Sequence, residues 1–193
     1  MVSFCPMKPH LLFGQSCTVL TAKLVGDPQN RSKHRVAQSQ AARALLAGAV
    51  QDRDDMRNAL LSDPRDGPLT YGPENTRLWT SVTHRRGFVG AALSETGPVG
   101  LDLEVLQDRQ NWAELAQVAW PDGVQPTDQI RFYLFWTLWE ACLKCGVENR
   151  FAEIATKCAQ TVTSAWVEGH VDRLRYAFCI DAQTVRAVVQ HPV

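Results

Sequence analysis

The sequence predicts an α+β fold in which each half of the chain contributes several strands and one main helix. Short apolar or alternating segments, separated by turns rich in Gly, Pro and Asp, indicate strands that pair as hairpins. Two longer segments, residues 30–50 and 127–146, have the length and the end signals of helices. We therefore divide the chain into an N-terminal half, residues 1–97, and a C-terminal half, residues 98–193.

The composition argues against several classes of protein. Hydrophobic residues make up 45% of the 193 residues, which allows a sizeable core. Lys plus Arg and Asp plus Glu each number 20, and this zero net charge argues against a broad nucleic-acid or membrane-surface binder, although a local basic patch stays possible. No run approaches the ~18 apolar residues of a membrane span, and residues 1–13 do not resemble a signal peptide. We expect a cytoplasmic protein.

The six cysteines are expected to be reduced thiols, because nothing in the sequence indicates secretion. Cys142 and Cys145 form a CxxC pair, which suggests a zinc or redox site. A structural zinc site needs a second ligand pair at suitable spacing, and the sequence offers none. The pair falls within a predicted helix, so we favour a packing role.

The expected elements of the N-terminal half are a strand or hairpin, a long helix capped by Asn30 or Ser32, a short helix with a loop, and a hairpin. In chain order they cover residues 11–24, 30–50, 51–78 and 79–93, with turns at residues 26–28 and 85–87. The C-terminal half is expected to hold a strand, a short helical piece, the second main helix and a three-stranded meander. These cover residues 99–105, 112–118, 127–146, 162–167, 174–180 and 185–189, with turns at residues 96–98, 168–170 and 181–183. Thr127 is the expected N-cap of the main helix, and Gly146 its stop.

The strand over residues 99–105 brings two carboxylates together. Its residues alternate strictly, so we expect a half-buried strand with the apolar set in the core and Asp102 and Glu104 on the other face. Gly100 should leave that face open beside them. Adjacent like charges repel unless a cation lies between them, and Mg²⁺ prefers such oxygen ligands. The alternative is a solvated strand face that happens to carry two acids.

The main helix of the C-terminal half adds an acid and a base. Glu140 and Lys144 lie one turn apart and share a face with Tyr133 and Thr137. Alone they are an ordinary i,i+4 pair. With the strand carboxylates they provide a third metal ligand and a cation, which together suit the binding of a pyrophosphate.

Basic residues also open the helix over residues 30–50. They are Arg31, Lys33, His34 and Arg35, followed by Arg43. Such a cluster is either a solvated start of a helix or a phosphate-binding site, and the sequence leaves both interpretations open.

Three segments resemble motifs of the 4′-phosphopantetheinyl transferases. Residues 99–104, VGLDLE, resemble the family's (V/I)G(I/V)D(I/V)E motif, and residues 136–144, WTLWEACLK, resemble WxxKEAxxK. Residues 81–84, SVTH, are similar to the family's LSHS strand, with Thr83 where Ser is usual. Length and the preceding half resemble the surfactin-synthetase-activating type. That type is a monomer of two pseudo-symmetric α+β halves, each an antiparallel sheet packed against a main helix, with the ligand site between them.

The resemblance implies a Mg²⁺-dependent transfer of phosphopantetheine from coenzyme A to a serine of an apo acyl or peptidyl carrier protein. Adenosine 3′,5′-bisphosphate leaves, and neither nucleic acid nor membrane is a partner. The implied metal ligands are Asp102, Glu104 and Glu140. The implied coenzyme A-binding residues are Lys144, His84, Thr83, Arg31, Arg35 and Arg43. Asp102, Glu140 and Lys144 are the implied catalytic residues, with Glu140 or a metal-bound water as acceptor of the serine proton.

Two departures from the family pattern remove positive charge. Trp139 stands where the family has a lysine before the glutamate, and Asp66-Gly67-Pro68 replaces a GKP motif. These departures favour the alternative interpretation, a degenerate homologue that binds coenzyme A or a carrier protein without efficient transfer. A third possibility is an unrelated α+β domain with chance motifs. We expect Trp139 to be a packing residue whose ring lies against Phe135.

Overall fold

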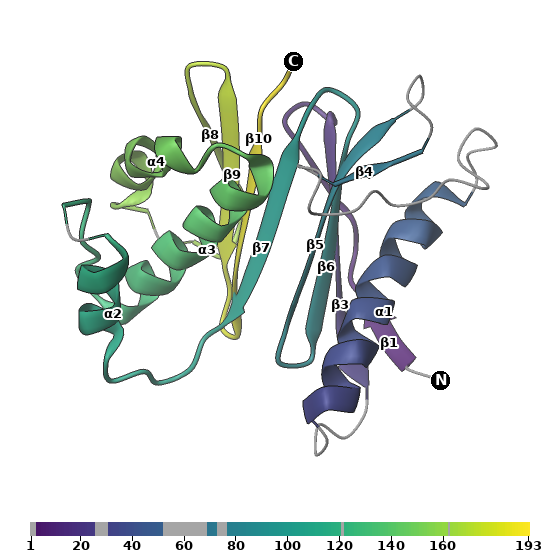
Figure 1. Cartoon of the computed structure of the whole chain (residues 1–193), viewed down its shortest axis with the longest axis horizontal. Coiled ribbons are helices and arrows are strands. Elements are labelled where there is room, and N and C mark those ends of the chain that lie inside the picture. Colours follow the sequence, from purple (N-terminus) through teal and green to yellow (C-terminus); the bar gives the residue numbers. More distant parts are fainter. Residues whose placement is uncertain (1–2, 26–30, 52–68, 73–76, 121, 162) are drawn as a thin grey trace.

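The computed structural model contains two antiparallel sheets that lie side by side, with helices on their outer sides (Figure 1). It describes residues 3–25, 31–51, 69–72, 77–120, 122–161 and 163–193, and for residues 3–6, 25 and 31–35 the backbone alone. The predicted α+β class is confirmed, since each sheet packs against one main helix. No helix of the described residues has both the length and the apolar composition to span a membrane.

The first sheet has the strand order β1-β3-β6-β5-β4, and β2 pairs with β3 outside this path. Its strands are β1 (Ser3–Pro6), β2 (His10–Leu12), β3 (Cys17–Val25), β4 (Thr70–Tyr71), β5 (Leu78–Arg85) and β6 (Phe88–Ser94). The long helix α1 (Arg31–Val50) covers one face through alanine and leucine residues. The hairpin and the helix confirm the sequence prediction, whereas β1 and β4 were not predicted. Of the short helix and loop expected over residues 51–78, residues 52–68 and 73–76 lie outside the described residues.

The β5–β6 hairpin turns on two residues, not three. Arg86 and Gly87 both have positive φ angles, 41° and 85°, as the two central residues of a type I′ turn require. Arg85 was expected in the turn, but it belongs to β5 and pairs with Phe88. Its side chain therefore takes its direction from the alternation of the strand.

The second sheet has the strand order β7-β10-β9-β8. Its strands are β7 (Val99–Val105), β8 (Val167–Val171), β9 (Leu174–Ile180) and β10 (Thr184–Gln190), and its helices are α2 (Trp112–Ala119), α3 (Gln129–Cys145) and α4 (Phe151–Cys158), the last preceded by the 3-10 helix η4 (Glu148–Arg150). Helix α3 ends at Gly146, as predicted. Its N-cap is Asp128 and not Thr127, because the Asp128 carboxylate accepts a hydrogen bond from the Arg131 N–H at 2.8 Å. Helix α4 and η4 were not predicted.

The first hairpin of the meander is displaced from its expected position. The predicted strand over residues 162–167 begins at Val167, and the turn expected at residues 168–170 lies inside β8. The chain turns at Asp172, which has φ 52°. Gly169 serves cross-strand packing, because a Cβ there would lie 2.3 Å from the Tyr176 hydroxyl on β9. A glycine between polar residues thus gave a misleading turn signal.

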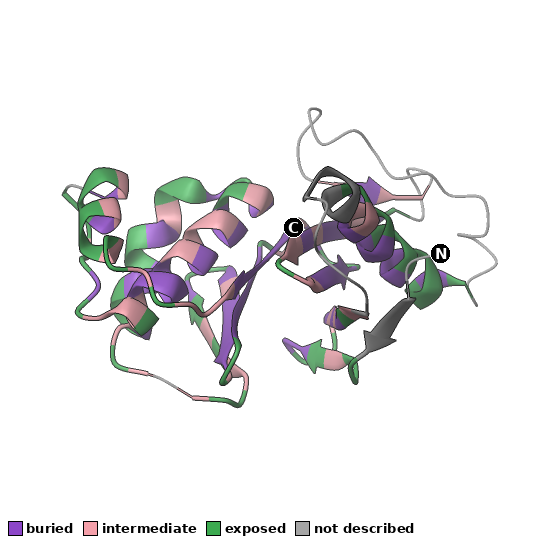
Figure 2. Ribbon diagram, turned by 90° about the horizontal axis from the view of Figure 1, so that it is seen from below, coloured by how far each residue is buried: buried purple, intermediate pink, exposed green. Residues whose placement is uncertain are grey.

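Strand β7 is buried on both faces, because it lies between the first sheet and α3. Leu101 and Val99 pack against residues of the first half such as Val19 and Ala92. The opposite face lies under α3. Figure 2 shows buried residues along the strands in the middle of the molecule and exposed ones on the outer helices. The expectation of a half-buried strand is therefore wrong, and so is the alternative of a solvated carboxylate face.

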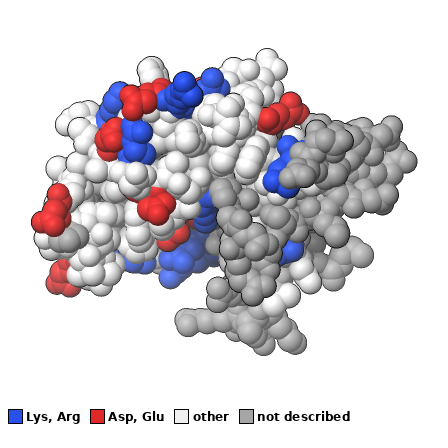
Figure 3. Space-filling view, turned by 45° about the horizontal axis from the view of Figure 1, so that its top comes forward, with Lys and Arg blue, Asp and Glu red and all other residues white. Residues whose placement is uncertain are grey.

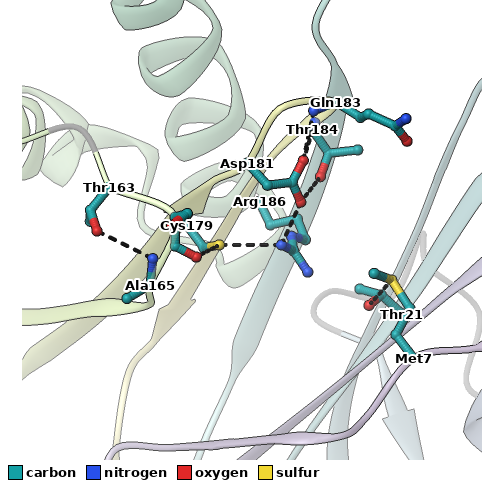
Figure 4. A network of polar contacts seen from close by, with 10 residues as sticks. Met7, Thr21, Thr163, Ala165, Cys179, Asp181, Gln183, Thr184 and Arg186 are labelled. Carbon is teal, nitrogen blue, oxygen red and sulfur yellow. Dashed lines mark hydrogen bonds and ion pairs between the residues drawn. The ribbon is translucent and has the colours of Figure 1, made fainter.

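Buried polar groups also lie where the two sheets meet. The Gln190 amide is fully buried and donates hydrogen bonds to the hydroxyls of Ser94 at 2.7 Å and Thr96 at 2.9 Å. On the same strand, Arg186 donates to the Asp181 carboxylate at 2.7 Å and to the Cys179 sulfur at 3.2 Å (Figure 4). Because buried polar groups are costly when unpaired, the bond from Gln190 to Ser94 of β6 favours one arrangement of the two sheets, whereas the Arg186 bonds lie within the second sheet.

Candidate functional site

The site begins where α3 crosses β7 at Gly100. A Cβ on Gly100 would lie 1.9 Å from the Ala141 carbonyl oxygen and 2.8 Å from the Cys145 nitrogen, both backbone atoms of α3. The glycine therefore does not leave an open face, as we expected from the sequence. It allows the helix backbone to lie directly on the strand, and this contact brings the end of α3 over the carboxylate face of β7.

Asp102 is the best-connected residue of the site. It is 6% exposed, and its Oδ1 accepts hydrogen bonds from the Thr83 hydroxyl at 2.9 Å and the Lys144 ammonium at 2.8 Å. Its Oδ2 is buried and has no hydrogen-bond partner among the described residues. Three predicted residues thus meet, and one carboxylate oxygen keeps its full capacity to bind a cation.

Side chains of β5 and α3 form hydrogen bonds with the backbone of β7 at the edge where it pairs with no strand of its own sheet. The Leu101 N–H donates to the Ser81 hydroxyl at 2.9 Å, and the Leu101 carbonyl accepts from Lys144 at 3.1 Å. Ser81, Thr83 and Arg85 alternate along β5 and all contact β7. Sequence analysis missed Ser81 and Arg85, although polar residues at i, i+2 and i+4 of one strand were a readable signal.

Glu104 lies beside two guanidinium groups. Arg85 Nε lies 2.8 Å from Glu104 Oε2, yet neither atom forms a hydrogen bond, so this contact is an ion pair without directed N–H donation. Burial raises the pKa of Glu104 to about 7; Asp102 acts in the same direction, and Arg85 and Arg109 act against it. The Arg109 guanidinium lies 5.9 Å from the ring centroids of Phe132 and Tyr133.

Glu140 completes the predicted carboxylate set from the helix side. Burial raises its pKa, and the neighbouring Asp102 raises it further, while Lys144 and Arg85 lower it. The carboxyls of Glu104 and Glu140 each interact electrostatically with that of Asp102. Strand and helix therefore bring the three acidic groups into one neighbourhood.

The donor chemistry of this neighbourhood fits a hard divalent cation, but the ligand cage is not preformed. Carboxylate oxygens suit Mg²⁺, and the orphaned Asp102 Oδ2 is a natural ligand atom. Within the described ranges, however, no group of three His, Cys, Asp or Glu side chains is placed to hold a metal ion. Asp102 and Glu104 instead pair with Lys144 and Arg85. Convergence of the three carboxylates on one Mg²⁺ stays a prediction.

Of the remaining predicted phosphate-binding residues, His84 and Arg43 have described side chains, and both lie on other faces than the carboxylates of β7. Strand alternation puts His84 on the face of β5 opposite Thr83, the face on which Leu78 and Val82 pack with residues of α1. Arg43 is exposed on α1. The side chains of Arg31 and Arg35, and Asp66-Gly67-Pro68, lie outside the described residues.

The CxxC cysteines belong to the core. Cys142 and Cys145 are 0% and 2% exposed and pack in the hydrophobic cluster under α3. Burial raises the pKa of both thiols to about 12. Unreactive, protonated thiols fit the packing role that the sequence favoured.

Trp139 is a packing residue, but with partners other than the expected one. Its ring lies 5.4 Å from that of Trp136 and 6.2 Å from that of Trp120, between centroids. Phe135 instead pairs with Trp120 and Phe151. Position 139 therefore extends the aromatic cluster of α3 and supplies no charge to the carboxylates.

One concavity lies away from the carboxylates. A pocket of about 620 Å³ lies between the Phe13–Gly14 turn and the β8–β9 hairpin, and no carboxylate of the predicted site lines it. Acidic and basic side chains lie near one another on the described part of the face shown in Figure 3. The chemistry of the carboxylate neighbourhood, not pocket size, therefore singles out the candidate site.

We expect Glu104→Gln to remove a pH dependence from the stability of the metal-free protein. The folded pKa of Glu104 is about 7 against 4.5 for the solvated group, so between these values the folded state keeps a proton that the unfolded state releases. The wild-type free energy of unfolding should fall by up to about 3 kcal/mol as pH rises through this range. Urea denaturation of both proteins in EDTA, from pH 5 to 8, measures the difference. A difference that does not grow with pH would contradict the assignment.

Comparisons with known proteins agree with the motifs. No family model matches the chain. The chain is 35% identical over 112 residues to the 4′-phosphopantetheinyl transferase AcpT of Escherichia coli O157:H7, which is 54% of each chain. It is 34% identical to the protein of that name from Escherichia coli K12 over the same share, and 34% identical over 77 residues to that of Salmonella typhi, 36% of this chain and 40% of the relative.

The chain thus spans about half the length of the first two curated relatives it matches. The three sequence motifs converge in the structure on Asp102, where Thr83 and Lys144 meet the strand. The matched residues and these motifs together support the assignment of this chain to the 4′-phosphopantetheinyl transferase superfamily.

Proposed function

We propose that this protein transfers the 4′-phosphopantetheine group of coenzyme A to a serine of an apo acyl or peptidyl carrier protein, with Mg²⁺ as cofactor and as a monomer. The observation that carries the proposal is Asp102, which Thr83 and Lys144 fix through Oδ1 while its buried Oδ2 stays unpaired. Similarity to relatives named 4′-phosphopantetheinyl transferase supports the reaction class.

In this reaction the serine oxygen bonds to the β-phosphorus of coenzyme A, and the bond to the leaving adenosine 3′,5′-bisphosphate breaks. Asp102, Glu104 and Glu140 would hold a Mg²⁺, whose chemistry is to neutralise charge on the phosphoryl oxygens. Lys144, about a third exposed, would contact the pyrophosphate beside Asp102. Glu140 has a raised pKa and is the candidate acceptor of the serine proton.

Mass spectrometry of apo carrier proteins tests the proposal directly. Acyl and peptidyl carriers are incubated separately with coenzyme A, Mg²⁺ and the protein, and one of them should gain the mass of one phosphopantetheine. A variant of that carrier with alanine in place of its acceptor serine is the control and should gain none. No gain on any carrier, despite binding of coenzyme A, would favour the degenerate homologue.

We expect the variant Trp139→Lys to be less stable and no more active than the wild type. The substitution removes ring contacts with Trp120 and Trp136 and should cost about 2 kcal/mol of stability. Chemical denaturation and the carrier assay, run on both proteins, measure the two effects. An inert wild type that gains activity with the lysine would show that the missing charge had disabled the site.

A further inference from the structure

Arg85 brings a cation to the carboxylates from the N-terminal half. It is the last residue of β5, and its guanidinium lies on the same side of the strand as Ser81 and Thr83, against β7. Its side chain is 40% exposed, whereas the Glu104 side chain beside it is 9% exposed. The arginine therefore stands at the solvent side of the site, with the acid behind it.

Arg85 has donors beyond those that face Glu104. Among the described residues its ion pair is with Glu104, through Nε at 2.8 Å, whereas a guanidinium has five N–H donors. The other cations of the described neighbourhood are more constrained. Lys144 donates to both Leu101 and Asp102, and Arg109 lies against two aromatic rings. Arg85 is thus best able to change partners.

Helix α3 leaves the site short of positive charge. Near the three carboxylates it supplies Lys144, whereas Trp139 is turned into the aromatic cluster. A diphosphate carries at least two negative charges, and guanidinium groups bind phosphate oxygens in pairs. A partly exposed arginine beside a candidate metal ligand can meet both needs.

We propose that Arg85 is a diphosphate-binding residue that leaves Glu104 for the substrate when Glu104 turns to a divalent cation. The inference rests on the proposed function and deepens it. Before binding, Arg85 balances the charge of Glu104; afterwards the cation does so, and the guanidinium binds the diphosphate. No covalent bond is made or broken in this exchange, and the charge of the site stays balanced throughout.

The test compares Arg85→Gln with Arg86→Gln in the full chain. Arg86 is exposed in the adjacent turn, so this control makes the same change in net charge one residue away. Calorimetric titrations measure binding of coenzyme A and of dephospho-coenzyme A, each with Mg²⁺, and of Mn²⁺ alone. Thermal melting of the three proteins verifies that they are folded.

Arg85→Gln should weaken both coenzyme A and dephospho-coenzyme A by at least about tenfold and to the same extent, because the diphosphate is common to both. Binding of Mn²⁺ alone should tighten by about threefold, since a competing cation has left Glu104. Arg86→Gln should change none of these three affinities by more than about twofold.

Three outcomes would overturn the inference. Unchanged coenzyme A binding in Arg85→Gln, with a wild type that binds, refutes the arginine's role and leaves the proposed function standing. Weaker Mn²⁺ binding shows that Arg85 only positions Glu104. A wild type that binds neither coenzyme A nor dephospho-coenzyme A refutes the proposed function, and the inference with it.

Discussion

Replacing Gly100 with alanine is expected to destabilise the protein by about 3 kcal/mol or more. The new Cβ would lie 1.9 Å from the Ala141 carbonyl oxygen and 2.8 Å from the Cys145 nitrogen. These are backbone atoms of α3, so no rotamer change can relieve the overlap, and the helix must move away from β7. Overpacking of cores costs about 1–3 kcal/mol where side chains adjust, and a clash with backbone belongs at or above that limit. Urea denaturation gives the free energy of unfolding.

Gly48→Ala is the matched control for this prediction. Gly48 is an exposed residue inside α1, and no atom lies within 4 Å of its ideal Cβ. Alanine should stabilise the helix there by about 0.5–1 kcal/mol, because it reduces the entropy lost on folding. If the Gly100 variant were as stable as the wild type, the close packing of α3 on β7 would be wrong.

Replacing Asp102 with asparagine is expected to reduce transfer to a carrier protein by at least about 100-fold. The substitution removes the charge of the residue at the centre of the site, and losses of this size follow the removal of one preorganised electrostatic group. The amide oxygen can still accept from Thr83 and Lys144, so stability should change by no more than about 1 kcal/mol. Initial rates by mass spectrometry, together with urea denaturation, separate the two effects.

Asp122→Asn makes the same chemical change on an exposed loop after α2 and should leave the rate unaltered. The affinity of the Asp102 variant for Mn²⁺ provides an independent measurement, and it should fall with the rate. Full transfer activity in Asp102→Asn would remove this residue from the mechanism and leave it as a structural contact between β5, β7 and α3.

Local signals were sufficient for most elements. Helix α3 was located by the spacing of its apolar residues and by Gly146, which adopts the left-handed conformation, with φ 78°, that ends helices. Strands β9 and β10 were located by largely apolar runs between turns, each interrupted by one arginine. These features depend on the backbone preferences of single residues and on the spacing of apolar side chains, and both can be read from residues that are close in the sequence.

Errors arose where a residue's role depended on distant parts of the chain. Gly169 was interpreted as a turn, but its missing side chain accommodates Tyr176 of the next strand. Arg85 was placed in a turn, and its ion pair with Glu104 crosses from one sheet to the other. The alternation along β5 indicated the direction of the Arg85 side chain, but the partner of either residue cannot be identified from the local sequence, because strand pairing and the packing of the two sheets bring the partners together.

For the site, the sequence by itself determined which groups are available: two carboxylates on one face of a strand, and an acid and a base one helical turn apart. Tertiary structure decided which of them meet. The contact of α3 with Gly100 brings Lys144 to Asp102, and the packing of β5 beside β7 adds Thr83 and Arg85. The tertiary structure also buries Glu104. Its pKa is about 7 because desolvation raises the pKa by more than Arg85 and Arg109 lower it. Alternation and spacing specify direction within one element, whereas burial and charge balance depend on all the elements packed around a residue.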